Sequence, residues 1–334
     1  MMKIGIVGAG GWGTALANLL AEKGYQPQLW CYEPELVEKI KSERENSYYL
    51  PGIKLNEKIF PSSDLEEVVS GKELVIWVVP SQYFRSVFEK AVPYLDKETI
   101  LVSATKGIET DSLKTMSQVM IELAPEYASR IAVISGPSFA REVAQKVITA
   151  ITCASHEPEI AQIVQHTLST DYFRVYSSVD IIGVELGGAS KNVIAIASGI
   201  CDGMGLGLNT RAAIITRGLA EITRLGIKMG ANPMTFAGLA GIGDLVLTCT
   251  GNLSRNYMVG YKIGQGKSLE EILSEMKMVA EGVKNVESIY RLSQKLDVEM
   301  PITEQVYLVL YADKSPKLAA SALMGRKLKE EFWF

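Results

Sequence analysis

Three glycines near the start of the chain, in "KIGIVGAGGWGTALA", restrict the fold more than any other feature. Gly8, Gly10 and Gly13 form the pattern GxGxxG directly after a strand-like apolar run and directly before a helical pattern. The first glycine permits a tight turn, the second lets the backbone approach a pyrophosphate, and the third lets helix and strand pack closely. The helix N-terminus offers amide donors to the phosphates. The stretch therefore predicts a dinucleotide site inside a strand–helix–strand unit.

The first half of the chain alternates short β-branched runs with amphipathic helical patterns. Because these runs are continuously apolar, the alternation predicts an α/β fold with a parallel, doubly wound sheet. The predicted strands are Lys3–Val7, Gln28–Cys31, Leu74–Val79, Thr99–Ala104, Arg130–Ser135, Thr149–Cys153 and Phe173–Tyr176.

Strand-like runs vanish after about Ser178, where long apolar helical segments are separated by turns such as "GLAGIGD" and "GYKIGQGKS". The 334 residues suit two domains. We expect a dinucleotide-binding domain over residues 1–178 and an all-helical domain for substrate and catalysis over residues 179–334. The apolar helices of the second domain can be buried within the chain or in a homodimer, and the sequence leaves both open.

Composition narrows the class of partner. The net charge is −4 and lysines and arginines do not cluster, which argues against nucleic acid or an anionic membrane surface as partner. The four cysteines are far apart and form no CxxC pair, as is typical of a protein of the reducing cytosol. We find no signal peptide and no transmembrane stretch, so we expect a cytoplasmic protein without an integral membrane segment.

The two histidines, His156 and His166, fall far from the strand ends where open α/β sheets bind ligands. His, Cys and carboxylate residues show no metal-ligand spacing, so we expect no metal site and no zinc-assisted hydride transfer. By elimination, the acid–base group of a nicotinamide-dependent reaction is a lysine, a tyrosine or a carboxylate.

Lys191 is the single charge between Leu186 and Cys201, in the apolar run "ELGGASKNVIAIASG". Burying an ammonium without a partner is costly. Lys191 is therefore either a lysine whose stem is buried and whose charge reaches solvent, or a proton-transferring group in an apolar site. Asp244, in "AGIGDLVLTC", is either a plain helix cap or the carboxylate partner of Lys191.

Three further segments place polar groups where ligands bind, after predicted strands or at predicted helix starts. Their residues are Lys106, Gly136, Ser138, Ser254, Arg255 and Asn256. An arginine, a hydroxyl and amide donors at a helix start suit a phosphate. Each segment alone fits a cap or a turn, but together with a dinucleotide fold they predict a small phosphorylated substrate.

The chain resembles the bacterial NAD(P)-dependent glycerol-3-phosphate dehydrogenases over essentially its whole length. Seven motifs carry the resemblance, in the order and spacing typical of that family: "GAGGWGTALA", "SATKGIE", "SGPSFARE", "GGASKNVIAIASG", "GLAGIGDLVLTCTG", "SRN" and "VAEGV". The resemblance implies a Rossmann domain followed by a helical domain like that of 6-phosphogluconate dehydrogenase. It also implies hydride transfer between NAD or NADP and the pair dihydroxyacetone phosphate and sn-glycerol 3-phosphate, which supplies phospholipid synthesis.

The resemblance also assigns roles to residues. Lys191 matches the proton acceptor, with Asp244 beside it. The implied substrate contacts are Lys106, Gly136, Ser138, Lys191, Asp244, Ser254, Arg255 and Asn256. Besides Gly8, Gly10 and Gly13 of the glycine motif, the implied cofactor contacts are Gly11, Trp12, Tyr32, Tyr49, Lys106, Ala140, Arg255, Val279 and Glu281.

Two positions depart from the family. Ser190 stands where the family usually has an aliphatic residue, and with Lys191 and Asn192 intact we expect activity to survive. The stretch "LWCYEP" after the second predicted strand lacks the arginine that some members carry there. An acid at this point favours NAD and an arginine favours NADP.

The choice between NAD and NADP stays open in the sequence. Glu33 either binds ribose hydroxyls or faces solvent, and the nearest basic residues, Lys39, Lys41 and Arg44, belong to the next helical pattern. Two alternative functions remain. One is a related reductase of another small hydroxy acid or phosphorylated polyol, and the other is a non-catalytic dinucleotide sensor.

Overall fold

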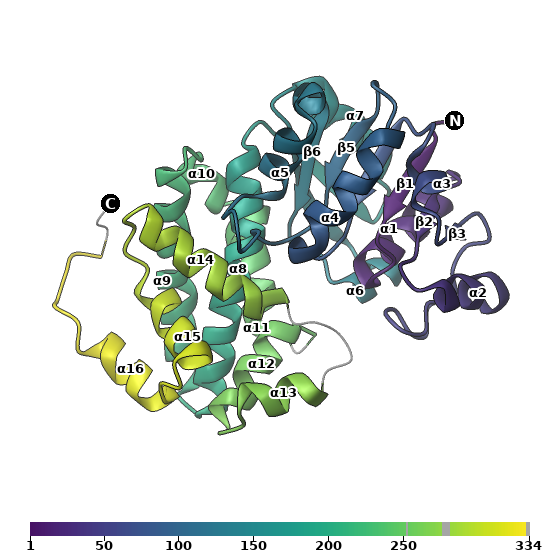
Figure 1. Cartoon of the computed structure of the whole chain (residues 1–334). Coiled ribbons are helices and arrows are strands. Elements are labelled where there is room, and N and C mark those ends of the chain that lie inside the picture. Colours follow the sequence, from purple (N-terminus) through teal and green to yellow (C-terminus); the bar gives the residue numbers. More distant parts are fainter. Residues whose placement is uncertain (252, 276–280, 332–334) are drawn as a thin grey trace. The chain divides into compact units, whose positions relative to one another are not determined.

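The computed structural model describes residues 1–251, 253–275 and 281–331, arranged in two compact units (Figure 1). The sheet unit comprises Met1–Lys106 and Thr115–Glu185, and the helical unit comprises Gly107–Lys114 and Leu186–Phe334. The chain therefore passes between the units three times. The assignment of cofactor and substrate roles to residues 1–178 and 179–334 stays a prediction.

The sheet unit contains one eight-stranded sheet in the order β3-β2-β1-β4-β5-β6-β7-β8. The strands are β1 (Ile4–Val7), β2 (Gln28–Trp30), β3 (Phe60–Ser62), β4 (Leu74–Trp77), β5 (Ile100–Ser103), β6 (Ile131–Ser135), β7 (Thr149–Ala154) and β8 (Phe173–Ser178). All seven predicted strands are present, within two residues at each end. The strand order reverses between the neighbours β1 and β4, as in a doubly wound sheet.

Two features of the sheet correct the prediction. The edge strand β3 was missed, because it is three residues long and holds Pro61, and proline weakens a strand pattern. The sheet is not wholly parallel either, because β7 runs antiparallel to β6. A buried strand shows the same apolar run whether it lies parallel or antiparallel to its neighbour, so the sequence pattern cannot reveal this reversal.

Helices cover both faces of the sheet (Figure 1). Ile4 and Ile6 face the helices α1 (Gly11–Glu22) and α7 (Pro158–Leu168). Val7 and Trp77 face α3 (Leu65–Val69), α4 (Ser81–Ala91) and α5 (Met116–Leu123) on the opposite side. Alternate residues of one strand thus enter two cores, which explains the continuously apolar strands. The short helices α2 (Pro34–Glu43) and α6 (Ala140–Ala144) complete the α-helices of this unit.

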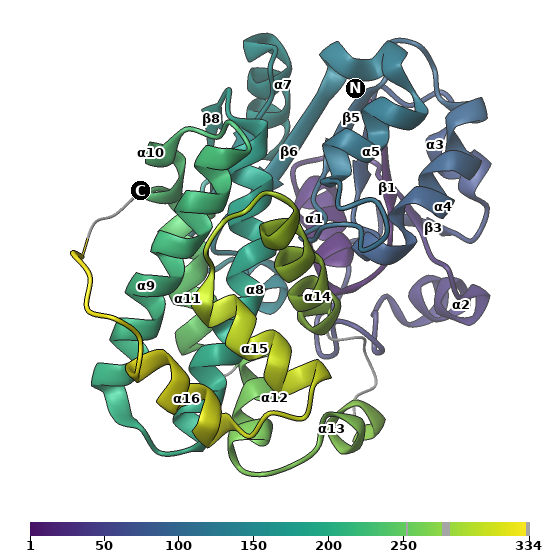
Figure 2. The same cartoon turned by 60° about the vertical axis from the view of Figure 1, so that its left-hand side comes forward.

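The helical unit is built around α8 (Ile181–Gly203), whose first residues still belong to the sheet unit (Figure 2). As predicted, the described residues of this unit contain no strand. The remaining elements are α9 (Gly207–Lys228), α10 (Pro233–Phe236), the π-helical turn η3 (Leu239–Gly243), α11 (Asp244–Thr250), α12 (Arg255–Gly264), α13 (Leu269–Glu275), α14 (Glu281–Lys295), α15 (Pro301–Tyr311) and α16 (Pro316–Met324).

Two segments of the described chain, Ile181–Gly203 and Pro233–Thr250, are long and apolar enough to cross a membrane by length and composition alone. The apolar window of the first is 94% buried inside the structure, as in a core helix. The second contains α10, the turn η3 and α11, so it is not one continuous α-helix. The burial of the first segment fits a helix that packs within a folded unit, and the expected lack of a membrane segment stays a prediction.

Candidate active site

The glycine-rich turn joins the carboxyl end of β1 to α1. Gly8 has a φ of +119°, and a Cβ at Gly13 would collide with the carbonyl oxygen of Gly8. Both positions therefore require glycine, as the motif predicted. A Cβ at Gly10 would meet no described atom within 4 Å, so open space lies beside this backbone.

The N-terminus of α1 is free to receive an anion. No side chain in the described part of the chain caps this terminus, and the first amide that bonds back is that of Thr14, to the carbonyl oxygen of Gly10 at 2.9 Å. The amides of Gly11, Trp12 and Gly13 precede that bond. Amides in this position attract phosphate.

A buried asparagine, Asn46, fastens a second segment to this turn. Its Nδ2 donates to the carbonyl oxygen of Ala9 and to Thr14 Oγ1, both at 2.8 Å, and its Oδ1 accepts from the Tyr49 amide at 3.0 Å. The carbonyl oxygen of Tyr49 would lie 2.8 Å from a Cβ at Gly11. The sequence analysis missed Asn46, because an asparagine in the polar stretch "SERENSYYL" is typical of a loop.

Tyr49 also reaches the end of β2. Its hydroxyl donates to Glu33 Oε1 at 2.7 Å, and this hydrogen bond is the largest cause that raises the pKa of Tyr49 to about 12. Glu33 occupies the N-cap position of α2 and is partly exposed. The neighbouring Tyr32 is 77% exposed. Glu33 is thus tied to the loop that holds the glycine-rich turn, and it does not simply face solvent.

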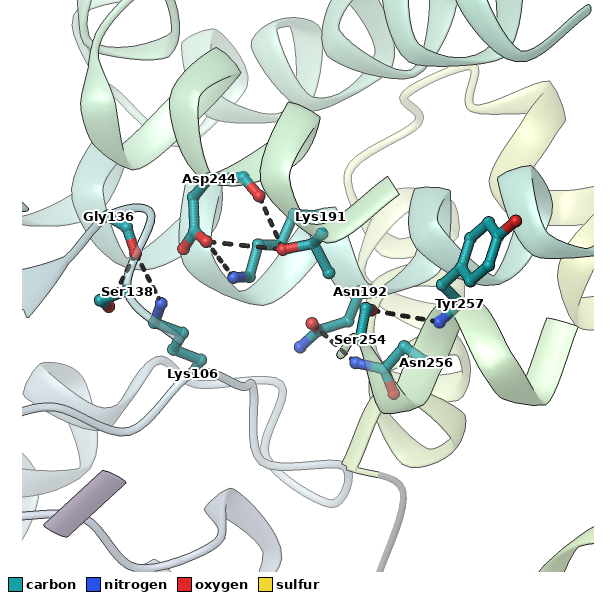
Figure 3. A network of polar contacts seen from close by, with 10 residues as sticks. Lys106, Gly136, Ser138, Lys191, Asn192, Asp244, Ser254, Asn256 and Tyr257 are labelled. Atoms are coloured by element: carbon teal, nitrogen blue, oxygen red, sulfur yellow. Dashed lines mark hydrogen bonds and ion pairs between the residues drawn. The ribbon is translucent and has the colours of Figure 1, made fainter. Parts of the chain in front are cut away.

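Lys106 and Ser138 meet at one carbonyl group of the sheet unit (Figure 3). Lys106 Nζ and Ser138 Oγ each lie 3.0 Å from the carbonyl oxygen of Gly136. Lys106 follows β5 and Gly136 follows β6, so both side chains stand at the carboxyl ends of parallel strands. Ala140 begins α6, and its Cβ is 3.7 Å from a Cβ position at Gly11.

In the helical unit, Lys191 Nζ forms an ion pair with Asp244 Oδ1 (Figure 3). Lys191 is 6% exposed and Asp244 is 1% exposed. Of the two alternatives for Lys191, the one in which the charge reaches solvent is therefore wrong, and the predicted partnership with Asp244 is present. Thr248 donates to the carbonyl oxygen of Asp244 at 2.6 Å and holds the first turn of α11.

A glycine lets these two charges meet. Gly187 precedes Lys191 by one helical turn on the same face of α8. A Cβ at Gly187 would collide with the carbonyl oxygen of Ala240 in the turn η3. Because α8 touches the backbone of η3, and η3 leads directly into Asp244, the carboxylate arrives next to the lysine.

Four glycines form a contact between α8 and α12 that we call the glycine seam. They are Gly199 and Gly203 of α8 and Gly260 and Gly264 of α12. A Cβ at Gly260 would collide with the carbonyl oxygen of Ile196, and one at Gly199 with that of Tyr257. Ile196 meets Gly260 and, one turn later, Ile200 meets Gly264, so α8 and α12 run in the same direction. The N-terminus of α12 therefore lies level with Asn192.

The predicted phosphate segment lies at that N-terminus (Figure 3). Ser254 caps α12 by accepting from the Tyr257 amide at 3.2 Å, and Asn256 Nδ2 donates to Asn192 Oδ1 at 2.8 Å. Arg255 is exposed. The buried Asn256 Oδ1 has no hydrogen-bond partner among the described residues. The arginine and the helix amides are thus available to an anion, whereas the serine hydroxyl serves as the cap.

The other predicted residues of this unit are less informative. Glu281 begins α14, and the next residue, Gly282, packs against the Asn256 amide group. Val279 lies outside the described residues. Ser190 is 1% exposed, and its hydroxyl has no partner among the described residues, which explains why an aliphatic side chain also suits this position. Within the described chain, no group of three His, Cys, Asp or Glu side chains is placed to hold a metal ion.

Comparisons with known proteins identify the family of the chain. The family model described as NAD-dependent glycerol-3-phosphate dehydrogenase N-terminus matches residues 3–161, and the model for its C-terminus matches residues 180–321. A protein of Citrifermentans bemidjiense named glycerol-3-phosphate dehydrogenase [NAD(P)+] is 60% identical over 98% of this chain and 98% of its own. A Geobacter sulfurreducens protein of the same name is 57% identical over 99% of each chain.

A solved structure gives the same result. The crystal structure of glycerol-3-phosphate dehydrogenase from Coxiella burnetii is 41% identical, covers 97% of this chain and 99% of its own, and superimposes with a TM-score of 0.93. The structure of this protein and its similarity to the Coxiella burnetii structure thus both show a Rossmann sheet followed by a helical domain. By sequence, fold and motif order, the chain belongs to the family of NAD(P)-dependent glycerol-3-phosphate dehydrogenases.

Proposed function

We propose that this protein interconverts dihydroxyacetone phosphate and sn-glycerol 3-phosphate with NAD(H) or NADP(H). The observation that carries the proposal is the buried ion pair of Lys191 and Asp244. The residue after Lys191, Asn192, contacts Asn256 at the start of α12. A proton-transferring group and an anion-binding helix end are thereby held on two helices whose backbones touch.

Lys191 is the proposed acid and base. In the reductive direction its ammonium donates a proton to the alkoxide that develops on the substrate, and in the reverse direction the neutral amine takes the hydroxyl proton. The bound nicotinamide supplies or accepts the hydride. Asp244 stabilises the ammonium and orients it. A positioned acid–base group contributes about 10²–10⁴-fold in rate.

Arg255 and the amides at the N-terminus of α12 are proposed to bind the substrate phosphate. A guanidinium beside a helix N-terminus offers charge and directed donors together. Asn256 is fixed by Asn192 and is proposed to contact the substrate on the basis of the resemblance to the family. The further substrate contacts Lys106, Gly136, Ser138 and Ser254 rest on the resemblance to the family.

The sheet unit fits a nicotinamide dinucleotide. A bound dinucleotide would use three features of this unit. They are the open space at Gly10, the uncapped N-terminus of α1, and the buried Trp12 Nε1, which has no hydrogen-bond partner among the described residues. The proposed cofactor contacts are Gly8, Gly10, Gly11, Trp12, Gly13, Tyr32, Tyr49, Lys106, Ala140, Arg255 and Glu281.

The cellular role is also a proposal. We infer that the protein works in the cytoplasm, where it supplies sn-glycerol 3-phosphate for phospholipid synthesis, and that the helical unit allows a homodimer. Light scattering on the purified protein distinguishes a monomer from a homodimer.

The decisive experiment measures initial rates of NADH and NADPH oxidation by the purified protein, with and without dihydroxyacetone phosphate. Oxidation that depends on the phosphate substrate is the expected result. Turnover with other hydroxy-acid precursors or phosphorylated polyols, but not with dihydroxyacetone phosphate, would replace the proposal by a related reductase. Cofactor binding without any turnover would point to a dinucleotide sensor.

A further inference from the structure

A carboxylate stands at the carboxyl end of β2, the strand next to the one that carries the glycine-rich turn. β2 ends at Trp30, and Glu33 immediately precedes the first residue of α2, Pro34. Since β1 and β2 are parallel neighbours, their carboxyl ends open on the same edge of the sheet. Glu33 therefore lies on the side of the turn where the ribose next to the pyrophosphate is expected.

Glu33 is fixed in place by a chain of hydrogen bonds. Asn46, fully buried, holds the Tyr49 amide, and the Tyr49 hydroxyl donates to Glu33 Oε1 at 2.7 Å. The backbone of Tyr49 touches the glycine-rich turn at Gly11, so one tyrosine side chain spans from the turn to the carboxylate. The hydroxyl uses one acceptor site of Glu33, and a carboxylate has about four. The remaining sites can accept from the two hydroxyls of a ribose.

The basic side chains that follow Glu33 have other partners. Lys39 donates to Ser47 Oγ at 3.2 Å and lies 4.7 Å from the centre of the Tyr48 ring. Lys41 pairs with Glu38 at 3.6 Å, and Arg44 donates to the carbonyl oxygen of Ile59 at 3.2 Å. All three also lie more than one helical turn beyond the start of α2. A phosphate on the ribose would therefore meet a fixed negative charge, while each of these three cations is already engaged by another group.

We propose that Glu33, positioned by Tyr49 and Asn46, makes this protein select NAD(H) over NADP(H). The inference rests on the proposed function only in its choice of cofactor, because it concerns binding and not turnover. The ribose hydroxyls donate to Glu33, whereas a 2′-phosphate offers acceptors and negative charge to the same oxygens. Like charges at contact distance disfavour the phosphorylated cofactor.

Equilibrium titration of the intact protein with NADH and with NADPH, followed by nicotinamide fluorescence without substrate, tests the charge. We expect NADH to bind at least about tenfold more tightly than NADPH. Glu33→Gln removes the charge but keeps an acceptor for Tyr49, and it should reduce this ratio by about tenfold. Glu35→Gln makes the same change at an exposed carboxylate in the first turn of α2 and should leave the ratio unchanged. Equal affinities in the unaltered protein, or an unchanged ratio in Glu33→Gln, would overturn the proposal.

The Tyr49→Phe variant tests the positioning. It keeps the charge of Glu33 but removes the hydrogen bond, so NADH should bind several-fold more weakly while NADPH binding changes little. A uniform loss for both cofactors would assign Tyr49 a structural role and refute its part in selection. Because these titrations contain no substrate, a clear NADH preference without dehydrogenase activity would refute the proposed function and leave this inference intact.

Discussion

At the scale of single residues, the pair of Lys191 and Asp244 makes the sharpest prediction. Lys191→Met should lower kcat by about 10²–10⁴-fold, because proton transfer to the alkoxide is lost. NADH binding should persist, since the glycine-rich turn belongs to the sheet unit. Stopped-flow rates and fluorescence titration measure the two effects. Near-normal turnover would remove the lysine from the mechanism.

The same substitution leaves Asp244 buried without its cation, and breaking a buried pair in this way costs about 3–5 kcal/mol. The double variant Lys191→Met with Asp244→Asn removes both charges and should recover much of that stability without recovering activity. This control separates loss of chemistry from loss of folding.

Arg255 and Lys262 provide a matched test of the phosphate site, because they lie at opposite ends of α12. Arg255→Ala should raise the KM for dihydroxyacetone phosphate by at least about tenfold, as expected when a charge-assisted contact to a phosphate is lost. Lys262 pairs with Glu275 at 2.7 Å, so Lys262→Ala should leave KM unchanged. Equal effects of the two substitutions on KM would mean that net charge, and not the helix start, attracts the substrate.

Residues of the site differ in how far the sequence reveals them. Lys191 stands out as a lone charge in an apolar run, and a search for its partner finds Asp244. Asn46 shows no such signal. Its importance comes from complete burial against Ala9 and Thr14, which are distant in the chain, and no local pattern encodes a contact of that range.

At the scale of helices and strands, the glycine seam should tolerate no side chain. Gly260→Ala places a methyl group against the carbonyl oxygen of Ile196 and should lower the free energy of unfolding by about 1–3 kcal/mol, measured by urea denaturation. Gly325→Ala is the control, since Gly325 is exposed at the end of α16, has a φ of −79° and would keep its methyl group 3.3 Å from the nearest atom, the carbonyl oxygen of Ser321. If both variants lose the same stability, the seam is not the cause.

A second prediction at this scale concerns the buried carboxylate of Glu221 in α9. It accepts from the amides of Ile302 and Thr303 at 2.6 and 3.1 Å and caps α15. Burial outweighs these hydrogen bonds and raises the pKa of Glu221 to about 7. The native state then binds the proton more tightly than the unfolded chain, so the stability that this proton gives is complete below about pH 4.5 and is lost as pH rises through about 7.

Thermal unfolding of the unaltered protein and of Glu221→Gln across that pH range measures this effect. The uncharged variant should lack this component of the decline in stability with rising pH. A decline of equal size in both proteins would place its origin at other groups.

Elements that depend on local pattern were predictable, and those that depend on distant partners were not. Apolar runs identified seven strands, but Pro61 hid β3, and nothing in "SGPSFARE" shows that β7 reverses direction after α6. Similarly, Glu221 caps α15 from about eighty positions earlier in the chain. Pro301 marks the start of α15 in the sequence, but nothing there identifies Glu221 as its capping group.

At the scale of the whole molecule, the chain is interleaved between its units. Gly107–Lys114 begins soon after strand β5 ends at Ser103, but it belongs to the helical unit. The Ile108 amide donates to the buried Asn285 Oδ1 at 3.4 Å, Thr110 and Ser288 hydroxyls are 2.8 Å apart, and Arg291 donates to the carbonyl oxygen of Thr110 at 3.1 Å. The sequence analysis did not anticipate that residues 107–114 belong to the helical unit.

We expect the Asn285→Ala variant to raise amide hydrogen exchange in residues 107–114 and in α14 but not in β5, because a buried acceptor is lost within the helical unit alone. Mass spectrometry of peptides from the exchanged protein measures this. Increased exchange in β5 without a change in α14 would show that the segment depends on the sheet unit instead.

The glycine seam has a consequence for the choice of substrate. Because the backbones of α8 and α12 touch, the separation between the backbone of Lys191 and the helix end beside Arg255 is set by main-chain contact and not by the size of a side chain. A molecule bound at both points must have its phosphate and its carbonyl carbon a set number of bonds apart. If Lys191 and Arg255 bind the substrate as proposed, homologues with a longer chain between these two groups would be rejected by length, even where every functional group is the same.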